Sequence, residues 1–330
     1  MDWTVPQLLQ FTGSYWGVCA LHSGVKLDIF SQLADGPQSH AVVAHKCASD
    51  PRATAMLLDA LAALGLLVKA HDAYALTDFA AAHLVSSAPD YLGHIIMHHH
   101  HLMSSWVKLP EAVKSGRPVR ASVSHGDDEE MRKSFLLGMY NLASQLAPLV
   151  AAKVDLGGCQ RLLDLGGGPG TYAIHFCLRN PALAATVFDL PTTRNFAEEC
   201  VARFGLSERI SFHPGNYEVD ELPSGFDTVW LSHILHSEGE EQCLALLRKA
   251  AAVLEPGGRL MVQDFILADD KAAPLFPALF SLNMLVGTPQ GRAYARGELV
   301  AMLTAVGLTD IRQLEIDLPN GAGIVAGVKR

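Results

Sequence analysis

One stretch decides the fold of this chain: Leu162-Leu163-Asp164-Leu165-Gly166-Gly167-Gly168-Pro169-Gly170. The apolar run at its start is typical of a buried strand, and the glycines at 166, 168 and 170 predict a turn that lets the backbone approach a ligand closely. Asp189 ends the next apolar run, residues 184–188, so its carboxylate is expected at the carboxyl end of a neighbouring strand. There it can accept hydrogen bonds from a ribose diol, and the two features together predict a nucleoside-binding crevice.

The glycine spacing excludes two common nucleotide sites. The dinucleotide fingerprint G-x-G-x-x-G/A requires Gly or Ala at position 171, where this chain has Thr171, and no G-x-x-x-x-G-K-[ST] phosphate loop occurs. The spacing that remains, G-x-G-x-G stiffened by Pro169, resembles motif I of S-adenosylmethionine-dependent methyltransferases, whose ligand carries an amino acid rather than phosphates. For this motif alone, a tight strand-to-helix turn without a ligand is the alternative.

Strands and helices alternate from residue 161 to residue 267. Further strands are expected at 209–213, 226–232 and 259–267, and a helix at 240–254 ends at Pro256-Gly257-Gly258. Because parallel neighbours need crossover connections, this alternation predicts an α/β fold with a doubly wound parallel sheet.

The end of the chain predicts a different kind of strand pair. A helix at 298–306 ends at Gly307, and strand-like runs cover 311–318 and 323–328. The connection between these two runs, residues 319–322, is so short that they must be antiparallel. The sheet is therefore expected to end in a hairpin.

Five segments, in this order and spacing, carry a family resemblance: 162–170, 188–191, 232–236, 254–259 and 263–267. They resemble the plant caffeic-acid-type and bacterial small-molecule O-methyltransferases over nearly the whole length of the chain. The resemblance implies a Rossmann-like methyltransferase domain behind a winged-helix dimerisation domain, S-adenosyl-L-methionine as cofactor, and a small-molecule acceptor. It specifies neither the acceptor nor the pathway.

Length and composition agree with a two-domain enzyme. The 330 residues are divided into an expected dimerisation domain at 1–95, a linker with substrate-pocket helices at 96–150, and a cofactor-binding domain at 151–330. The formal charge of −9 disfavours a nucleic-acid partner. The first residues lack a basic n-region, and no uninterrupted run of 18 apolar residues occurs, so a cytoplasmic protein without a membrane partner is expected. The six cysteines form no C-x-x-C pair, which favours reduced thiols over zinc ligands or disulfides.

The first part of the chain has the order of a winged helix. Helices are expected at 25–33, 41–47 and 51–67, the last with an Asp50 N-cap before Pro51, and a two-stranded wing at 65–77. Such a domain either binds DNA or mediates dimerisation. Residues 1–150 hold ten Lys or Arg against thirteen Asp or Glu, so the basic surface that DNA requires is missing. The resemblance implies a homodimer whose N-terminal domains intertwine, each lending residues to the partner's substrate pocket.

His236 is the candidate catalytic base. It lies just past the expected strand 226–232, at the edge of the sheet where ligands bind in open α/β folds. Methylation of a phenol, with a pKa of about 10, requires removal of a proton, and a neutral imidazole suits that task. The resemblance aligns His236 with the family's base and Asp264 with the acid that orients it. His233 is a rival base, and a helix-entry residue without chemistry is the alternative for His236.

The resemblance also implies the residues around the two ligands. The expected cofactor-binding residues are Asp164, Gly166, Gly168, Asp189, Leu190, Asn216, Tyr217 and Ser232. The apolar residues that could line the acceptor pocket are Trp106, Phe276, Phe280 and Met284. At helical spacing, such residues are more often part of the core.

The chain departs from the plant pattern at several positions. Ser237-Glu238-Gly239 follows the base in place of Asp-Trp, and Ala293 stands where the family has a second acid. Asn216 replaces the aspartate near the adenine, and Ser232 replaces a lysine. His236 is thus left with one supporting carboxylate. N- or C-methylation remains an alternative reaction, and a cofactor-sensing winged-helix regulator an alternative of another class.

Three conspicuous polar runs are expected to be structural. His98-His99-His100-His101 falls in a helical stretch, where consecutive side chains diverge, so a shared metal is not expected, although the resemblance places this helix over the acceptor pocket. Asp127-Asp128-Glu129-Glu130 is expected as the solvated start of a helix at 131–149, and Asp269-Asp270 as a solvated loop. The sequence predicts no metal requirement.

Overall fold

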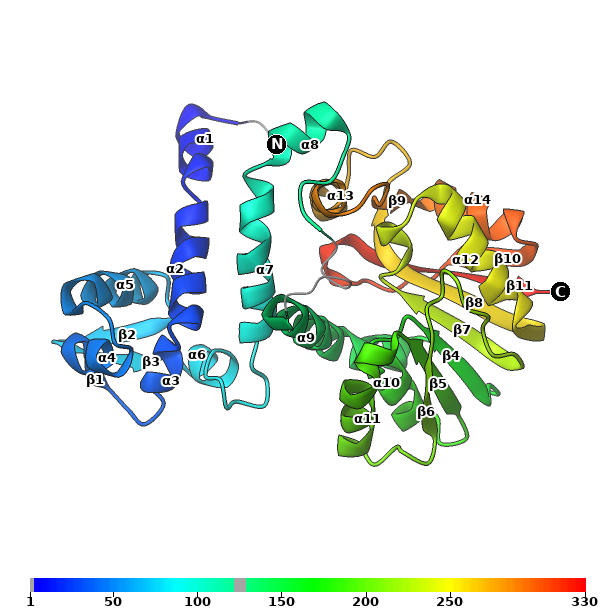
Figure 1. Ribbon diagram of the computed structural model, residues 1–330, viewed down its shortest axis with the longest axis horizontal. Helices are drawn as coiled ribbons and strands as arrows, with labels where there is room; N and C mark the ends of the chain where they lie inside the picture. Colours follow the sequence, from blue (N-terminus) through cyan, green and yellow to red (C-terminus); the bar gives the residue numbers. More distant parts are fainter. Residues whose placement is uncertain (1–2, 122–128) are drawn as a thin grey trace. The chain divides into compact units, whose positions relative to one another are not determined.

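The computed structural model describes residues 3–121 and 129–330, and Figure 1 labels its helices and strands. The chain forms two compact units, Met1–Met103 with Asp128–Asn141, and Ser104–Asp127 with Leu142–Arg330. Residues 96–150, expected as a separate linker, are divided between these units. The helices of that segment are α7 (Gly93–Trp106), α8 (Leu109–Ser115) and α9 (Glu129–Lys153). Helix α9 begins at Glu129, and Asp127 and Asp128 lie outside the described residues.

The first unit contains a small antiparallel sheet among helices. Its sheet has the order β1-β3-β2, with β1 (Gln38–Ser39), β2 (Leu67–Ala70) and β3 (Ala73–Leu76). Its short helices are α1 (Val5–Thr12), α2 (Tyr15–Lys26), α3 (Ile29–Gln32), α4 (His40–Lys46), α5 (Pro51–Ala63) and α6 (Asp78–His83). The predicted cap of α5 is confirmed, because Asp50 accepts a hydrogen bond of 2.8 Å from the backbone of Ala53.

The helix predicted at 25–33 is wrong. The chain turns at Asp28, which has a φ of 53°, so α2 ends at Lys26 and α3 begins at Ile29. The turn buries Ile29, Phe30 and Leu33 in the core of this unit, and that burial outweighs the helical periodicity of the sequence. Helices α1 and α2 upstream of the turn were not predicted.

The second unit is built on a large sheet, whose strand order is β10-β11-β8-β7-β4-β5-β6 (Figure 1). Its parallel strands are β4 (Arg161–Leu165), β5 (Ala184–Asp189), β6 (Ile210–Pro214), β7 (Phe226–Ser232) and β8 (Leu254–Leu267). Strand β11 (Ala322–Lys329) is antiparallel to both β8 and β10 (Leu308–Gln313), and the short β9 (Tyr294–Ala295) pairs in parallel with the end of β8. The predicted doubly wound sheet with an antiparallel terminal pair is confirmed.

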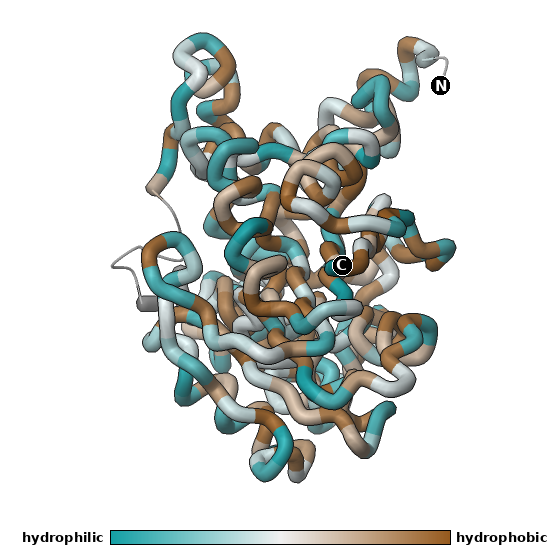
Figure 2. Tube along the Cα trace, turned by 90° about the vertical axis from the view of Figure 1, so that its right-hand side faces the viewer, coloured by the Kyte–Doolittle hydropathy of each residue, from teal (hydrophilic) through white to brown (hydrophobic). Residues whose placement is uncertain are grey.

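Helices cover both faces of this sheet. They are α10 (Thr171–Arg179), α11 (Arg194–Arg203), α12 (Glu240–Ala252), α13 (Leu275–Gly287) and α14 (Arg296–Ala305). Trp230 of β7 packs on Phe176 of α10, whereas its neighbours Val229 and Leu231 join the core cluster that includes α12. Alternate residues of one strand thus serve opposite faces. In Figure 2 the chain is coloured by hydropathy, and brown stretches recur along it.

Two strands differ from the prediction by more than one residue at an end. Strand β8 begins at Leu254 rather than 259, because the chain continues extended through Pro256 and pairs with β7 across a register shift. The strand predicted at 311–318 is Leu308–Gln313 instead, where Leu308 pairs with Lys329. The connection to β11 is therefore longer than the four residues predicted, and it contains a 3₁₀ turn at Pro319–Gly321.

Candidate active site

The glycine loop connects β4 to α10 at the carboxyl edge of the sheet. Gly166, Gly168 and Gly170 have φ values of 70°, 53° and 74°, which other residues rarely adopt. A side chain at Gly166 would also come within 2.5 Å of Ile234. Strand β4 lies between β5 and β7, where the chain changes direction across the sheet, and open α/β sheets bind ligands at this switch point.

Asp189 connects this loop to β5 through hydrogen bonds. Its carboxylate accepts hydrogen bonds from the backbone of Gly168 at 2.8 Å and of Leu190 at 2.7 Å, and from the hydroxyl of Thr193 at 3.1 Å. A carboxylate has about four acceptor positions, so capacity for a ligand hydroxyl remains. Burial raises the pKa of Asp189. The fastening of the loop was not predicted from the sequence, since it depends on a turn in which the amide of Gly168 points at the next strand.

Asp164 lies beneath the loop and is fully buried. It accepts one hydrogen bond of 3.3 Å from the backbone of Ala173, at the start of α10. Burial, with a smaller contribution from the charge of Asp189, raises the pKa of Asp164 to about 7. Two carboxylates that are costly to ionise thus lie at the ends of β4 and β5, and a cationic ligand beside them would favour their charged forms.

The other predicted cofactor residues follow the ends of β5, β6 and β7. Leu190 follows β5, Asn216 and Tyr217 follow β6, and Ser232 ends β7. The side-chain oxygen of Asn216 already accepts a hydrogen bond of 2.9 Å from the backbone of Glu218. The hydroxyl of Tyr217 donates to Glu238 at 3.4 Å, and burial raises its pKa. All eight predicted residues therefore lie at the same edge of the sheet.

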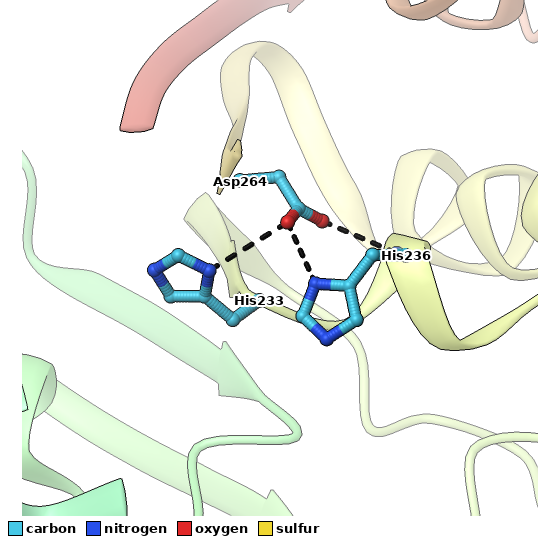
Figure 3. A group of neighbouring side chains, drawn as sticks. All are labelled: His233, His236 and Asp264. Atoms are coloured by element: carbon cyan, nitrogen blue, oxygen red, sulfur yellow. Dashed lines mark hydrogen bonds and ion pairs between the residues drawn. The ribbon is translucent and has the colours of Figure 1, made fainter. Parts of the chain in front are cut away.

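His236 and Asp264 form a buried pair on the next two strand ends (Figure 3). His236 sits in a 3₁₀ turn, Leu235–Ser237, just past β7, and Asp264 lies near the end of β8. Nδ1 of His236 is 2.7 Å from Oδ1 of Asp264, and the backbone N–H of His236 donates to Oδ2 at 3.2 Å. These two contacts fix the imidazole with Nδ1 protonated, which leaves the lone pair on Nε2. Among the described residues, none hydrogen-bonds to Nε2.

His233 approaches the same carboxylate from the other side (Figure 3). Its Nδ1 is 3.6 Å from Oδ1 of Asp264, beyond hydrogen-bond distance. Burial alone would raise the pKa of Asp264, but the two imidazoles hold it well below its usual range. In the described part of the chain, His233, His236 and Asp264 form the one group of His, Cys, Asp or Glu residues whose possible metal-ligand atoms all lie within 4.8 Å of one another. Hydrogen bonding accounts for the contact of His236 with Asp264, and His233 lies just outside that distance.

Aromatic rings surround the pair. Phe280 meets His236 edge-on at 4.8 Å between ring centroids, Phe265 lies 4.5 Å from His233, and Phe276 lies 4.9 Å from Phe265. Phe280 and Phe276 were predicted, whereas Phe265 was missed, although it directly follows Asp264 in one of the five motif segments. Of the other predicted acceptor residues, Met284 is buried, and Trp106 donates to Asn283 of α13 at 3.2 Å.

The polar runs are distributed among separate contacts. His98 packs on Phe135, while His100 lies 5.5 Å from the ring of His22 and 3.2 Å from the ammonium of Lys26, so the consecutive imidazoles diverge as predicted. Asp269 accepts a hydrogen bond of 2.7 Å from the backbone of Gly297, at the start of α14. Asp269 therefore has a capping role that the sequence did not indicate.

Comparison with protein families gives two matches. A model described as an O-methyltransferase domain matches residues 106–309, and one described as an O-methyltransferase dimerisation domain matches residues 9–86. Together they cover most of the chain.

Individual relatives cover nearly the full length. The chain is 34% identical over 319 residues to 3-hydroxy-5-methyl-1-naphthoate 3-O-methyltransferase of Streptomyces sahachiroi, covering 95% of this chain and 92% of that protein. It is 32% identical over 323 residues to the tetracenomycin polyketide synthesis 8-O-methyl transferase TcmO of Streptomyces glaucescens, covering 96% and 95%. It is 33% identical over 288 residues to the N,N-dimethyltransferase OxyT of Streptomyces rimosus, covering 84% and 82%.

Solved structures agree with these matches. The structure described as PigF with SAH superposes with a TM-score of 0.89 at 27% identity, covering 99% of this chain and 100% of that chain. Human N-acetylserotonin methyltransferase in complex with SAM superposes with a TM-score of 0.88 at 25% identity, covering 100% and 98%. The similarity therefore extends over both units.

Proposed function

Since this chain belongs to the O-methyltransferase family and uses S-adenosylmethionine, we propose that His236 removes the proton from a phenolic hydroxyl of a small aromatic acceptor during methyl transfer. The observation that carries the proposal is the 2.7 Å hydrogen bond between Nδ1 of His236 and Asp264. It leaves the basic Nε2 atom available, and the edge of Phe280 lies beside the same imidazole. His233 is the weaker candidate, because its contact with Asp264 is longer, at 3.6 Å.

The residues of the crevice suit the cofactor. The remaining acceptor position of Asp189 fits a ribose hydroxyl, the glycine loop permits close approach of the backbone, and Asp164 offers a buried carboxyl group whose ionisation a cationic ligand would favour. We assign cofactor binding to these residues and to the neighbouring Leu190, Asn216, Tyr217 and Ser232. When bound, the cofactor supplies a methyl group activated by a sulfonium charge.

His236 and Asp264 then divide the work on the acceptor. Nε2 of His236 accepts the phenolic proton, and Asp264 stabilises the imidazolium that forms. Asp264 stays ionised, because two imidazoles and the backbone N–H groups of His236 and Phe265 all favour its charged form. The positioned base contributes on the order of 10²- to 10⁴-fold.

The acceptor is expected to be a flat hydroxylated aromatic. Phe265, Phe276 and Phe280 form the apolar wall beside His236, and rings of this kind favour aromatic partners. Relatives of this chain are O-methyltransferases named for a hydroxynaphthoate, a tetracenomycin polyketide and acetylserotonin, which supports an aromatic acceptor. The similarity to an N,N-dimethyltransferase keeps an amine acceptor as the second candidate.

A labelled-methyl assay tests this proposal. Purified protein is incubated with methyl-labelled S-adenosylmethionine and with 3-hydroxy-5-methyl-1-naphthoate, acetylserotonin, and the amino analogue of each. Label in the methyl ether of a hydroxylated compound supports the proposal. Label only in the amines, with full activity retained by His236→Ala, would show that no base is required.

The dimerisation domain supports a homodimer, which we also propose. Leu9, Phe11 and Trp16 of α1 and α2 are each more than 60% exposed, and brown segments occur close to the N-terminus in Figure 2. Such side chains are expected to be buried against a second copy. We assign dimerisation to residues 1–95, acceptor-pocket helices to 96–150 and cofactor binding to 151–330. Light scattering that gives the mass of one chain at micromolar concentration would contradict the dimer.

We further propose that the protein functions in the cytoplasm. One described segment, Lys133–Lys153 of α9, is long and apolar enough to cross a membrane by length and composition. It includes Asn141, whose amide donates to the backbone of Tyr91 at 2.8 Å within the first unit, as in a helix of a packed domain. Recovery of the protein in the soluble fraction without detergent would agree with this, and recovery only in membranes would contradict it.

A further inference from the structure

The backbone at His233 is strained in a way that calls for an explanation. Its φ is 58°, in the left-handed region that β-carbon sterics make unfavourable for most residues. Such strain persists where surrounding contacts enforce it, and it is concentrated at functional sites. At His233 the enforcing contact is a hydrogen bond of 2.8 Å from its backbone N–H to the carbonyl of Gln263 on β8.

The side chain of His233 reaches two consecutive residues of that strand. Its Nδ1 lies 3.6 Å from Asp264, and its Nε2 lies 3.5 Å from the amide nitrogen of Gln263. Consecutive strand residues point to opposite faces of a sheet, so His233 bridges the two faces at the end of β8. Gln263 is fully buried, and its amide also donates to the hydroxyl of Tyr172 at 2.9 Å.

These contacts select one tautomer. As the side chain of Gln263 is oriented, its amide nitrogen faces Nε2 of His233 at 3.5 Å, which favours a lone pair on Nε2. In a neutral imidazole the proton is then on Nδ1, directed at Asp264. Three N–H groups already hydrogen-bond to that carboxylate, namely the backbone N–H groups of His236 and Phe265 and Nδ1 of His236. Two of these three bonds, from Phe265 and from Nδ1 of His236, end on Oδ1, and Nδ1 of His233 faces the same oxygen as a third, more distant donor.

We infer that His233 is a positioning residue, which holds the carboxylate of Asp264 against the proton-accepting imidazole of His236. This inference rests on the proposed function, because it concerns the same base. A shift of about 0.5 Å brings Nδ1 of His233 to hydrogen-bond distance from Asp264. With three donors facing Oδ1 and one bonded to Oδ2, the carboxylate is held in place when His236 takes up a proton. Tyr172 and Gln263 anchor His233 at its other nitrogen.

The tautomer can be measured without activity. Nitrogen-15 correlation spectra of imidazole-labelled protein distinguish protonation at Nδ1 from protonation at Nε2. We expect an Nδ1-protonated signal that disappears in His233→Asn, and a second one that disappears in His236→Ala. A His233 signal with the proton on Nε2 would overturn the inference while leaving the role of His236 intact.

A double-mutant cycle tests the action through Asp264. His233→Phe retains a ring but no nitrogen, and its kcat is expected to fall about fivefold with an unchanged KM for the cofactor. His233→Asn, which tolerates the positive φ and can donate one N–H, should recover most of that loss. In an Asp264→Asn background, His233→Phe should have no additional effect.

The control uses another strained histidine. His71 has a φ of 53° in the exposed turn between β2 and β3 of the first unit, so His71→Phe introduces the same backbone strain at a residue that makes no contact with Asp264. It should leave kcat unchanged. Equal losses for both Phe variants, or additive losses of His233→Phe and Asp264→Asn, would contradict the inference. Full activity of Asp264→Asn and His236→Ala would instead contradict the proposed function.

Discussion

Two sets of buried carboxylates at one sheet edge have opposite electrostatic properties. Asp164 and Asp189, at the ends of β4 and β5, have raised pKa values, because the effect of burial outweighs that of the hydrogen bonds they accept. Asp264, near the end of β8, has a lowered pKa, because two imidazoles and two backbone N–H groups converge on it. The negative charges of Asp164 and Asp189 need a positively charged ligand to stabilise them. The negative charge of Asp264 is stabilised by groups of the chain itself. Binding and catalysis therefore make different demands on the same residue type.

Removing the base should have the largest effect. His236→Ala is expected to lower turnover of a phenolic acceptor by about 10²-fold or more and to leave cofactor affinity nearly unchanged. Raising the pH should partly restore activity, because the phenol then ionises in solvent. Steady-state kinetics and calorimetry with S-adenosylhomocysteine measure the two quantities. A parallel loss of cofactor affinity would show that the site around His236 and Asp264 contributes to cofactor binding as well as to catalysis.

Asp189→Ala should weaken cofactor binding rather than turnover at saturation. The loss of a charged acceptor for the ribose is expected to cost about 1.5–3 kcal/mol. The hydrogen bond from the backbone of Gly168 is lost as well, so the glycine loop should become more susceptible to proteolysis. Calorimetry with S-adenosylhomocysteine measures the affinity, and Thr193→Val, which removes one hydrogen bond to the same carboxylate, serves as the milder control. Unchanged affinity in Asp189→Ala would contradict the assignment.

The ligand-free protein should lose stability as the pH rises through the titration of Asp164. The folded protein retains this proton up to a pH of about 7, whereas the unfolded chain releases it above a pH of about 4. Between pH 5 and 7 the wild type should therefore lose roughly 2–3 kcal/mol relative to Asp164→Asn, which has no such proton. Urea denaturation at both pH values measures the difference. If the wild type and Asp164→Asn differed by the same free energy of unfolding at pH 5 and pH 7, Asp164 would already be ionised in the folded protein.

Asp264 should have the opposite dependence. Its lowered pKa contributes stability that is present above the unfolded value of about 3.9 and is lost as the pH falls further. Asp264→Asn should therefore be about 1–2 kcal/mol less stable than the wild type at pH 7, with the gap narrowing below pH 4. Thermal unfolding at pH 3 and pH 7 measures the gap. If the stability gap widened in acid, the pKa of Asp264 would not be shifted in the opposite direction from those of Asp164 and Asp189.

Local signals made part of this site predictable. The strand at 226–232 is recovered with both ends correct, since its apolar run is continuous and turn residues bound it. The pairing of His236 with Asp264 was also anticipated, through the family resemblance rather than through spacing. Asp50 before Pro51 marked the start of α5 for a purely local reason.

Contacts between distant segments were not predictable from the sequence. The turn at Asp28 forms because tertiary burial of Phe30 overrides helical periodicity. The end of β10 is set by its partner β11, not by its own apolar pattern. The contact of His233 with Asp264 depends on a positive φ at His233, and the sequence does not show which histidine adopts this uncommon conformation.

The position of β11 affects how the chain can fold during synthesis. This strand lies between β8 and β10, although it is made after both of them. Ribosomes add about 5–20 residues per second, and 54 residues separate the end of β8 at Leu267 from the start of β11 at Ala322. The hydrogen-bonding edge of β8 thus stays open for roughly 3–11 seconds, a period in which another nascent chain could pair with it. Slower translation of this stretch would lengthen the period and increase the demand on chaperones.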